Sequence, residues 1–317
     1  MGHPLTLSIV TPSFNTGGYL AAAVQSVLDQ DWPNLEFLVM DGGSTDGSLD
    51  ILRSFGERVR WVSEKDQGQS DAINKGFART SGDVLTWLNA DDTLAPGAAR
   101  AAMEYFAAHP DVALVYGGAD YIDFRGNLIG PCVHIEPFSL HRLIHYSDYI
   151  VQPAAFFRRS ALAKVGGIDP SLNWAMDYDL WLRLARRYKV AYLPRKLANF
   201  RWLKDNKTAT GGEARLDEID RVLAKYGQGS PAFVRLERVN LRVQEARLAL
   251  RHRKVGQALS QFARANALLL SSPRAMWSMC RPTTWKIIWT GQVLRARAGK
   301  EHAAAAASSL RQENANA

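Results

Sequence analysis

Residues 85–92 read Leu-Thr-Trp-Leu-Asn-Ala-Asp-Asp, an apolar run that ends in two adjacent carboxylates. The pattern predicts a buried strand with Asp91 and Asp92 at its tip. Two like charges at a strand tip repel each other, and burial adds a desolvation penalty to both. A divalent cation removes both costs, because Mg²⁺ and Mn²⁺ are commonly held by one or two carboxylates together with substrate phosphates. The pair also fits a simpler interpretation, in which Asp92 caps the helix expected near Pro96 and Asp91 is solvated.

The residues before this stretch alternate between strand and helix patterns. This order predicts a parallel sheet with right-handed crossovers, in which ligands bind beyond the carboxyl ends of the strands. Thr11, Asp41 and the Asp91-Asp92 pair each follow or end a predicted strand, so we expect polar groups from three strands in one crevice. The predicted elements are strands over 5–12, 35–40 and 59–62 and helices over 19–29 and 48–55.

The chain lacks the glycine-rich phosphate motifs of dinucleotide-binding and P-loop proteins, since neither G-x-G-x-x-G nor G-x-x-x-x-G-K-[ST] is present. Its glycines follow the second strand instead, in Asp41-Gly42-Gly43-Ser44, where turn chemistry explains the glycines but not the carboxylate. Further along, Asp71, Asn74 and Lys75 are spaced to share one helix face. That face is either a solvated surface or a contact for the ribose and phosphates of a nucleotide.

The basic charge of the chain is concentrated in its last third. Residues 1–210 carry 21 Lys+Arg and 23 Asp+Glu, a net charge of −2, whereas residues 211–317 carry 18 and 8, a net charge of +10. This asymmetry indicates two regions with different partners. Cys132 and Cys280 match no zinc or redox spacing, so we expect no disulfide framework and a reducing compartment.

We expect neither a signal peptide nor a transmembrane span. The start Met-Gly-His-Pro-Leu-Thr lacks the charged residues and the long apolar stretch of a signal peptide. No window approaches 18 apolar residues without a charge. A cytoplasmic location is therefore expected.

Short motifs follow one another along the first two thirds of the chain, and any one of them alone is a weak signal. They are Ser8-Ile9-Val10-Thr11-Pro12-Ser13-Phe14-Asn15, Asp41-Gly42-Gly43-Ser44-Thr45-Asp46-Gly47, Asp71-Ala72-Ile73-Asn74-Lys75-Gly76, Leu88-Asn89-Ala90-Asp91-Asp92, Gln152-Pro153-Ala154, Val165-Gly166-Gly167-Ile168-Asp169 and Met176-Asp177-Tyr178-Asp179-Leu180-Trp181. In this order they resemble the inverting nucleotide-sugar glycosyltransferases of family 2, over about residues 5–210. The resemblance implies the GT-A fold: an α/β, Rossmann-like, mixed and mainly parallel sheet flanked by helices, here with a C-terminal α-helical extension.

The resemblance also implies roles for individual residues. Asp92 would bind Mg²⁺ or Mn²⁺ bridging the donor diphosphate, and Asp91 would contact the ribose or sugar. Asp41 would accept from an N–H of the nucleobase, without choosing among uracil, guanine and thymine. The full set expected to bind the nucleotide-sugar donor is Thr11, Pro12, Asp41, Asp71, Asn74, Lys75, Asp91 and Arg201.

A second carboxylate is needed for inverting transfer, as a general base that deprotonates the acceptor hydroxyl. The family places an Asp, often as Glu-Asp, where this chain has Met176-Asp177. Asp177 is therefore the expected base, although it also fits a plain acid in the first turn of a helix, where the helix dipole favours a carboxylate. Trp174 and Asp179 are the expected acceptor contacts, and Trp174 also fits simple packing.

Two departures from the family pattern bear on the reaction. Many relatives have a histidine near residue 203 that helps to hold the metal, and this chain has Leu203 there. We therefore expect Asp92 to be the main protein ligand, with water or the donor completing the metal site, or else weaker metal dependence. The chain also lacks the Gln-x-x-Arg-Trp signature of processive polymerases, which favours transfer of one sugar per encounter.

We expect three regions: a catalytic domain over 1–210, a basic helical region over 211–300 and a disordered tail over 301–317. Helices are predicted over 213–226 and over 232–270, the latter with a break near residues 251–254. Residues 241–300 contain 12 Lys+Arg against one acid. Trp277, Trp285 and Trp289 lie among these basic residues, which suits peripheral contact with the cytoplasmic membrane face. A basic hairpin packed on the catalytic domain and a nucleic-acid patch are the alternatives.

The resulting hypothesis is a metal-dependent inverting glycosyltransferase of the hexosyltransferase type. It would move one sugar from a nucleotide-diphosphate-sugar to a glycan or lipid-linked acceptor, in cell-surface polysaccharide or lipid-linked glycan biosynthesis, and we expect no nucleic-acid partner. The alternative is a non-catalytic nucleotide-sugar or glycan-binding module of the same fold, which Met176 and Leu203 keep open.

Overall fold

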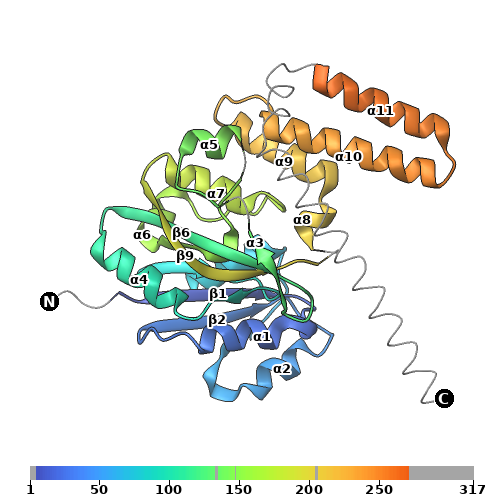
Figure 1. Ribbon diagram of the computed structural model, residues 1–317. Coiled ribbons are helices and arrows are strands. Elements are labelled where there is room, and N and C mark those ends of the chain that lie inside the picture. Colours follow the sequence, from blue (N-terminus) through green and yellow to red (C-terminus); the bar gives the residue numbers. More distant parts are fainter. Residues whose placement is uncertain (1–4, 133–134, 147, 204–205, 271–317) are drawn as a thin grey trace, which may run out of the picture. The chain divides into compact units, whose positions relative to one another are not determined.

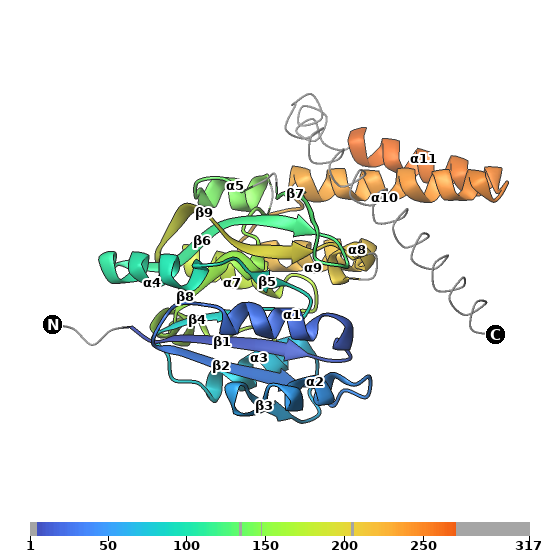
Figure 2. The ribbon, with the colours of Figure 1, turned by 60° about the horizontal axis from the view of Figure 1, so that its bottom comes forward.

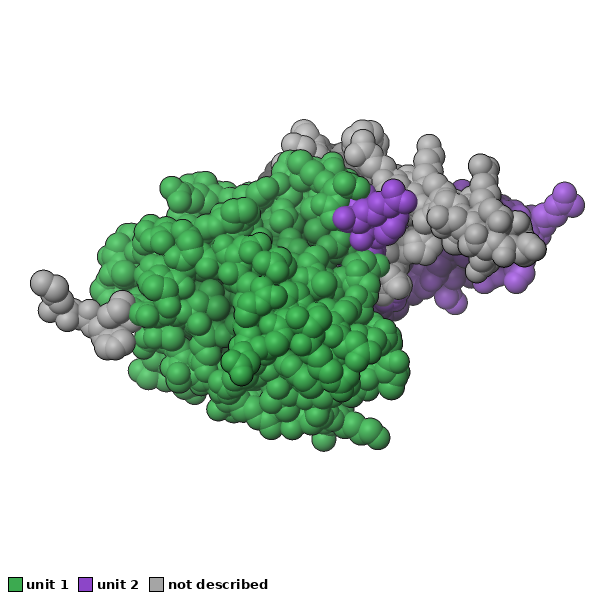
Figure 3. Space-filling view, turned by 90° about the horizontal axis from the view of Figure 1, so that it is seen from below, with its two compact units in different colours: residues 1–122, 126–201 green, residues 123–125, 202–317 purple. Residues whose placement is uncertain are grey.

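The computed structural model describes residues 5–132, 135–146, 148–203 and 206–270 (Figure 1). The chain divides into two compact units, coloured separately in Figure 3. Unit 1 comprises residues 1–122 and 126–201, and unit 2 comprises residues 123–125 and 202–317. Among the described residues, no helix is both long and apolar enough to span a bilayer.

Unit 1 begins with alternating strands and helices and continues with a mixed second half (Figure 2). The first half contains β1 (Leu7–Ser13), α1 (Gly17–Leu28), β2 (Leu35–Asp41), α2 (Ser48–Ser54), the 3₁₀ turn η1 (Gly56–Arg58), β3 (Arg60–Ser63), α3 (Gln69–Ala78) and β4 (Val84–Trp87). The second half contains β5 (Thr93–Leu94), α4 (Ala98–Ala108), β6 (Val112–Ile122), β7 (Leu128–Pro131), α5 (Leu140–His145), η2 (Gln152–Ala154), β8 (Ala155–Arg158), α6 (Arg159–Val165), α7 (Met176–Ala185) and β9 (Lys189–Arg201).

The described strands form one mixed sheet in the order β3-β2-β1-β4-β8-β6-β9-β5, with β7 paired to β6. Strands β3, β2, β1 and β4 are mutually parallel, as the alternating sequence pattern predicts. Strand β8 is antiparallel to both of its neighbours, and β6 and β9 are parallel. The expected α/β class with a mixed sheet flanked by helices is confirmed.

Strand β1 is buried on both faces, which explains why it reads as a nearly continuous apolar run. Ile9 belongs to the core that includes Leu20 and Val24 of α1. Val10 points the other way, toward α3, because successive side chains of a strand alternate. A Cβ atom on Gly76 of α3 would lie 2.4 Å from Val10 Cγ1, so only glycine lets α3 approach the sheet this closely.

The end of β4 is held next to the end of the longest strand, β9. The two residues of β5 follow Asp92 directly, and they pair antiparallel with Asn199 and Ala198 of β9. Arg201 is the last residue of β9 and thus lies beside the turn that contains Asp91 and Asp92. This contact between residues more than 100 positions apart builds the centre of the candidate site.

The described part of unit 2 is helical, with α8 (Lys207–Thr210), α9 (Gly212–Ala224), α10 (Ala232–Arg251) and α11 (Val255–Leu270). Helices α9 and α10 are joined by Arg238, whose guanidinium contacts the carboxylates of Asp217 at 2.8 Å, Asp220 at 2.9 Å and Glu213. The break expected near residues 251–254 is the turn between α10 and α11. The tryptophans expected at a membrane, Trp277, Trp285 and Trp289, and the tail over 301–317 lie outside the described residues.

Candidate active site

The carboxyl ends of the first parallel strands place polar groups side by side. Ser13, the last residue of β1, is the register partner of Asp41 in β2, and Asp41 is in turn the partner of Ser63 in β3. Thr11 and Pro12 precede this end and are buried, and the Thr11 hydroxyl has no hydrogen-bond partner among the described residues. The register therefore brings the ends of β1, β2 and β3 to one edge of the sheet. The expected crevice that also includes Asp91 and Asp92 stays a prediction.

Asp41 holds its own loop together. Its Oδ2 accepts hydrogen bonds from the backbone N–H groups of Gly43 at 2.9 Å and Ser44 at 3.0 Å, and from the Ser63 hydroxyl at 2.6 Å. Its Oδ1 accepts from the Ser44 hydroxyl at 2.5 Å. Four donors satisfy this buried carboxylate, so Asp41 first shapes the loop that follows β2. Its expected contact with a nucleobase stays a prediction.

Asp92 is buried like Asp41 but is only partly satisfied. Its Oδ1 accepts a hydrogen bond from the backbone N–H of Arg201 at 2.8 Å, whereas its Oδ2 has no hydrogen-bond partner among the described residues. Burial, followed by the charge of Asp91, raises the pKa of Asp92 well above its usual range. The helix after this turn, α4, begins at Ala98 with Gly97 as its N-cap, so Asp92 is not a helix cap.

Arg201 fixes the turn that carries both aspartates. Its Nε donates to the backbone carbonyl of Asp91 at 2.7 Å, and its guanidinium lies over the ring of Tyr19 at 5.1 Å from the centroid. Arg201 is itself buried, and a planar guanidinium held by a carbonyl and a ring has little freedom to move. The structure therefore gives Arg201, expected as a donor contact, a role in positioning Asp91 and Asp92.

The residues of α3 that are expected to bind the nucleotide-sugar donor make hydrogen bonds or ion pairs within the protein. The Lys75 ammonium lies 2.8 Å from Asp71, and this hydrogen bond lowers the pKa of Asp71 and raises that of Lys75. Asn74 bonds the backbone of Ile168 in both directions, donating to its carbonyl at 2.8 Å and accepting from its N–H at 3.1 Å. Asn74 thus ties α3 to the loop after α6, whereas Asp71 in the first turn of α3 and Lys75 in its last turn remain partly exposed.

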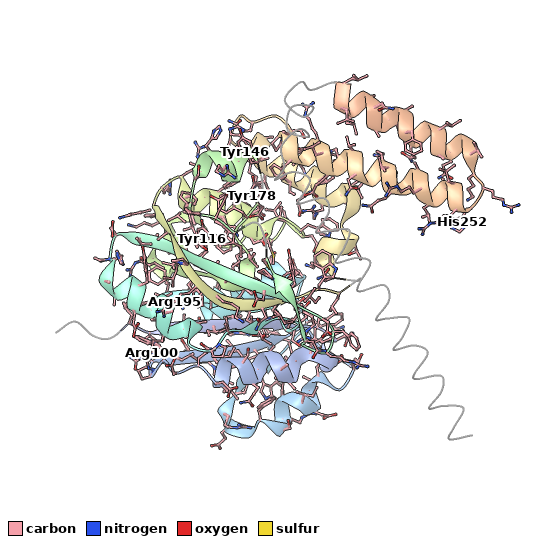
Figure 4. The ribbon with its side chains drawn as sticks, viewed as in Figure 1. Arg100, Tyr116, Tyr146, Tyr178, Arg195 and His252 are labelled. Carbon is pink, nitrogen blue, oxygen red and sulfur yellow. The ribbon has the colours of Figure 1, made fainter. Side chains whose placement is uncertain are left out.

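Helix α7 presents Asp177 in its first turn. The next residue, Tyr178, is labelled in Figure 4; it is buried, and its hydroxyl donates to the backbone carbonyl of Leu143 at 2.8 Å. This bond anchors the start of α7 to α5. Asp177 is half-buried, and Trp174, just before the helix, is also partly exposed.

Asp179, expected as an acceptor contact, is 1% exposed and accepts from Arg183 Nε at 2.7 Å. Arg183 also donates to the Val165 carbonyl at 2.8 Å. This ion pair accounts for Asp179 without any ligand, so a role at the acceptor would need the pair to open.

Two glutamines near the Asp91-Asp92 turn are absent from the residues expected in the site. Gln69 Nε2 donates to Asn89 Oδ1 at 2.6 Å, and Gln152 Nε2 donates to the Trp87 carbonyl at 2.7 Å. Gln152 Oε1 is buried and has no partner among the described residues. A glutamine inside the apolar run Val151–Ala154 is the signal that marks Gln152 in the sequence, because a buried amide needs partners.

Stacked indoles connect the strand that ends in the aspartates with the helix that carries Asp177. Trp87 of β4 and Trp181 of α7 are both fully buried, and their rings stack at 5.7 Å between centroids. Phe77 and Phe157 pack edge-on against Trp87. A rigid aromatic cluster therefore sets the position of the α7 start relative to β4.

The donor set at Asp92 fits a hard divalent cation. Mg²⁺ and Mn²⁺ prefer carboxylate oxygens, and Oδ2 of Asp92 is a buried carboxylate oxygen that no donor satisfies. In the described residues no group of three or more His, Cys, Asp or Glu side chains gathers as a complete metal cage. A cation at Asp92 would therefore take most of its other ligands from a bound diphosphate and from water.

The family model described as glycosyl transferase family 2 matches residues 8–166, half of the chain. The chain belongs to glycosyl transferase family 2. An uncharacterized glycosyltransferase of Rickettsia typhi is 27% identical over 233 residues, which are 69% of this chain and 71% of that protein. The chondroitin synthase of Escherichia coli is 32% identical over 182 residues, but these cover 56% of this chain and only 26% of the synthase. Glycosyltransferase activity is the function that family membership supports.

Solved structures show the same fold at low sequence identity. TarS of Staphylococcus aureus in complex with UDP-GlcNAc matches with a TM-score of 0.56 at 13% identity, over 83% of this chain and 92% of that one. The mannosyltransferase of Pyrobaculum calidifontis in complex with GDP-Man and Mn²⁺ matches with a TM-score of 0.56 at 18% identity, over 93% and 86%. The likeness establishes a GT-A fold for this family 2 chain.

Proposed function

We propose that this family 2 glycosyltransferase moves one sugar from a nucleotide-diphosphate-sugar to an acceptor hydroxyl with inversion. The observation that carries the proposal is the buried, unpaired Oδ2 of Asp92 at the end of β4. A buried carboxylate oxygen with no donor is costly unless a cation or a ligand completes it. A donor diphosphate with Mg²⁺ or Mn²⁺ supplies both.

Asp92 would hold the cation through Oδ2 while the Arg201 N–H keeps Oδ1 in place. The cation, when bound, neutralises the charge that develops on the leaving nucleoside diphosphate. Asp91 lies in the same turn, and we propose that it contacts the ribose or the sugar. Because the turn is fixed by Arg201 before any donor arrives, little rearrangement is needed on binding.

Asp177 is the proposed general base. Asp177 lies in the first turn of α7, where the helix dipole favours a carboxylate, and it would accept the proton of the acceptor hydroxyl. The hydroxyl oxygen then attacks the anomeric carbon on the face opposite the diphosphate, which inverts the configuration. Tyr178 and the Trp87–Trp181 stack hold the start of α7 during this step.

The remaining donor contacts are proposed at the strand ends and on α3. Thr11 and Asp41 would meet the nucleobase, and Asp71 and Lys75 would face the ribose and phosphates. Trp174, partly exposed before α7, would stack on a sugar face of the acceptor. The acceptor we propose is a lipid-linked glycan of a cell-surface polysaccharide pathway, which the enzyme would reach by peripheral contact with a membrane.

A thermal-shift screen of UDP-, GDP- and dTDP-sugars with and without Mn²⁺ tests donor binding, because a ligand that binds only the native state raises its melting temperature. Transfer or donor hydrolysis by wild type and by Asp177→Asn tests the chemistry. We expect donor binding by both proteins and turnover by the wild type alone. Binding without any turnover by the wild type would favour the non-catalytic module, and unchanged turnover by Asp177→Asn would remove Asp177 from the role of base.

A further inference from the structure

Helices α10 and α11 of unit 2 form a hairpin whose seam is made of small side chains. The two helices lie side by side in Figures 1 and 2. Ala246 and Ala249 of α10 pack with Ala258 of α11 as a buried cluster, and Ala265 is also buried. Alanines allow the helix backbones to approach closely, but they place little apolar area in the seam.

The large apolar side chains of the hairpin are on the outside instead. Six of the eight exposed large hydrophobic residues in the described part of the chain lie on these two helices. On α11, Val255, Leu259 and Phe262 follow at spacings of four and three residues, so they share one face, and Leu270 continues it. Leu259 is 64% exposed and Val255 is 56% exposed. We call Val255, Leu259, Phe262 and Leu270 the apolar stripe.

Basic side chains surround the turn from which the apolar stripe starts. Residues 241–270 contain six Lys+Arg and a single acid, Glu245, which pairs with Arg242 at 3.1 Å. His252, labelled in Figure 4, marks the turn between the helices. The exposed basic residues at and before this turn are Arg247, Arg251, Arg253 and Lys254. Within the described residues none of these four forms an ion pair, so their charges are open to a partner.

We propose that the α10–α11 hairpin is a docking surface for an anionic lipid bilayer, with the apolar stripe entering the acyl region and the basic residues meeting lipid phosphates. The hairpin would make the membrane contact that is part of the proposed function, and this contact does not depend on the sugar-transfer chemistry. An exposed apolar face beside lysine and arginine is the pattern of a helix that lies in a membrane interface.

The positive charge of the hairpin favours an anionic bilayer over a second copy of the chain or its own C-terminal residues. A second copy would bring the same excess of positive charge against itself, which opposes association. Residues 271–317 of this chain carry seven Lys+Arg and two acids, so they too are mismatched in charge with the hairpin. A nucleic acid would satisfy the basic residues but would leave the apolar stripe exposed to water.

The test is co-sedimentation of the full chain with vesicles of 30% phosphatidylglycerol in phosphatidylcholine, compared with phosphatidylcholine alone. We expect pelleting with the anionic vesicles that weakens as salt increases. The double variant Val255→Gln/Leu259→Gln should lower the partition coefficient by tenfold or more, since two side chains lose their apolar insertion. The triple variant Arg251→Gln/Arg253→Gln/Lys254→Gln should lower it by about a hundredfold, at about fivefold for each charge.

Control variants separate the hairpin from other surfaces. Leu128→Gln, at an equally exposed position of β7 in unit 1, should leave partitioning unchanged. The variant Trp277→Ser/Trp285→Ser/Trp289→Ser removes the tryptophans of the C-terminal region. If only this variant lost binding while both hairpin variants pelleted like wild type, the hairpin proposal would fail and membrane association would stand.

Two further outcomes would overturn the proposal. One is equal pelleting with neutral and anionic vesicles. The other is a dimer, seen by light scattering, that dissociates in Val255→Gln/Leu259→Gln, because the stripe would then be a self-association face. Thermal melting of each variant guards against misfolding, and no large change is expected because the substituted side chains are exposed. If the wild-type protein bound vesicles but transferred no sugar, the result would contradict the proposed function and would still support the docking surface.

Discussion

Replacing Asp92 with Asn should stabilise the protein in the absence of divalent ions. At neutral pH the wild-type carboxylate is buried beside Asp91 with one oxygen unpaired, and burial is the main cause of its raised pKa. The amide of Asp92→Asn is neutral and nearly the same size. Its Oδ1 can still accept from the Arg201 N–H. The substitution therefore removes a charge penalty while keeping the packing of the turn.

The size of the effect follows from two opposing contributions. Oδ2 of the carboxylate and the amide nitrogen that replaces it both lack a partner, so the cost of an unsatisfied buried polar group cancels. The substitution removes only the extra cost of the buried charge, on the order of 2–3 kcal/mol. Against this, the hydrogen bond from Arg201 loses roughly 1 kcal/mol when its acceptor becomes neutral. A net gain on the order of 1–2 kcal/mol remains. For a unit of the size of unit 1, 1 kcal/mol moves the melting temperature by about 2–4 °C, so we expect a rise of roughly 2–8 °C.

The pH dependence of this gain has a definite sign. The folded-state pKa of Asp92 lies above its unfolded value, near 3.8, so the folded state binds the proton more tightly. The wild type therefore loses stability as the pH rises from about 3.8 through the raised pKa, while the Asn variant does not. The advantage of Asp92→Asn should be full at alkaline pH and should shrink as the pH falls.

Thermal unfolding in EDTA between pH 5 and pH 8.5 measures this, with Asp179→Asn as the matched control. Asp179 is equally buried but is paired with Arg183, so its substitution should cost about 1.5–3 kcal/mol. Adding Mn²⁺ and a nucleoside diphosphate should then stabilise the wild type and not Asp92→Asn. A lower melting temperature for Asp92→Asn in EDTA at pH 8 would refute the reasoning, because the Arg201 contact would then outweigh the unpaired charge.

Three other substitutions test packing and buried polar contacts, two in unit 1 and one in unit 2. Gly76→Ala should lower the melting temperature through a loss of about 1–3 kcal/mol, because the added methyl meets Val10 at 2.4 Å and α3 must move; Ala72→Gly in the same helix is a comparison without a clash. Gln152→Leu leaves the Trp87 carbonyl without its donor, so we expect a loss of roughly 1–3 kcal/mol and slower transfer, measured by unfolding and by turnover. Arg238→Gln should destabilise unit 2 by on the order of 2 kcal/mol, because three carboxylates lose their shared cation. A thermal melting curve by circular dichroism that is the same as that of the wild type would contradict this.

Much of the first half of unit 1 could be predicted from the sequence, because its signals are local. The apolar runs, turn glycines and helical spacing mark β1 to β4 and the helices between them, and strand ends in a parallel sheet share one edge. The turn between α10 and α11 was also predictable, since the apolar spacing breaks in the basic run that starts at Arg251. In these segments the local sequence pattern and the tertiary fold favour the same secondary structure.

The contacts that complete the site could not be predicted, because they join distant residues through backbone atoms. Arg201 meets Asp92 across 109 positions, and Asn74 meets Ile168 across 94. The residue types on either side do not predict such a hydrogen bond, since the backbone N–H or carbonyl of almost any residue can form it. The helix-face pattern that made Asn74 a donor contact is equally satisfied by its bonds to Ile168. Spacing identifies which residues share a face, but it does not identify what that face meets.

Asp41 and Asp92 show how the structure separates two residues that look alike in the sequence. Each is an aspartate near the carboxyl end of a buried parallel strand, and each is about 1% exposed. Asp41 accepts three hydrogen bonds from its own loop and a fourth from Ser63 of β3. Asp92 accepts from the Arg201 N–H, and its Oδ2 has no partner among the described residues. A carboxylate whose two oxygens already accept four hydrogen bonds gains little from a cation. A divalent cation should therefore bind to the unpaired Oδ2 of Asp92 and not to Asp41.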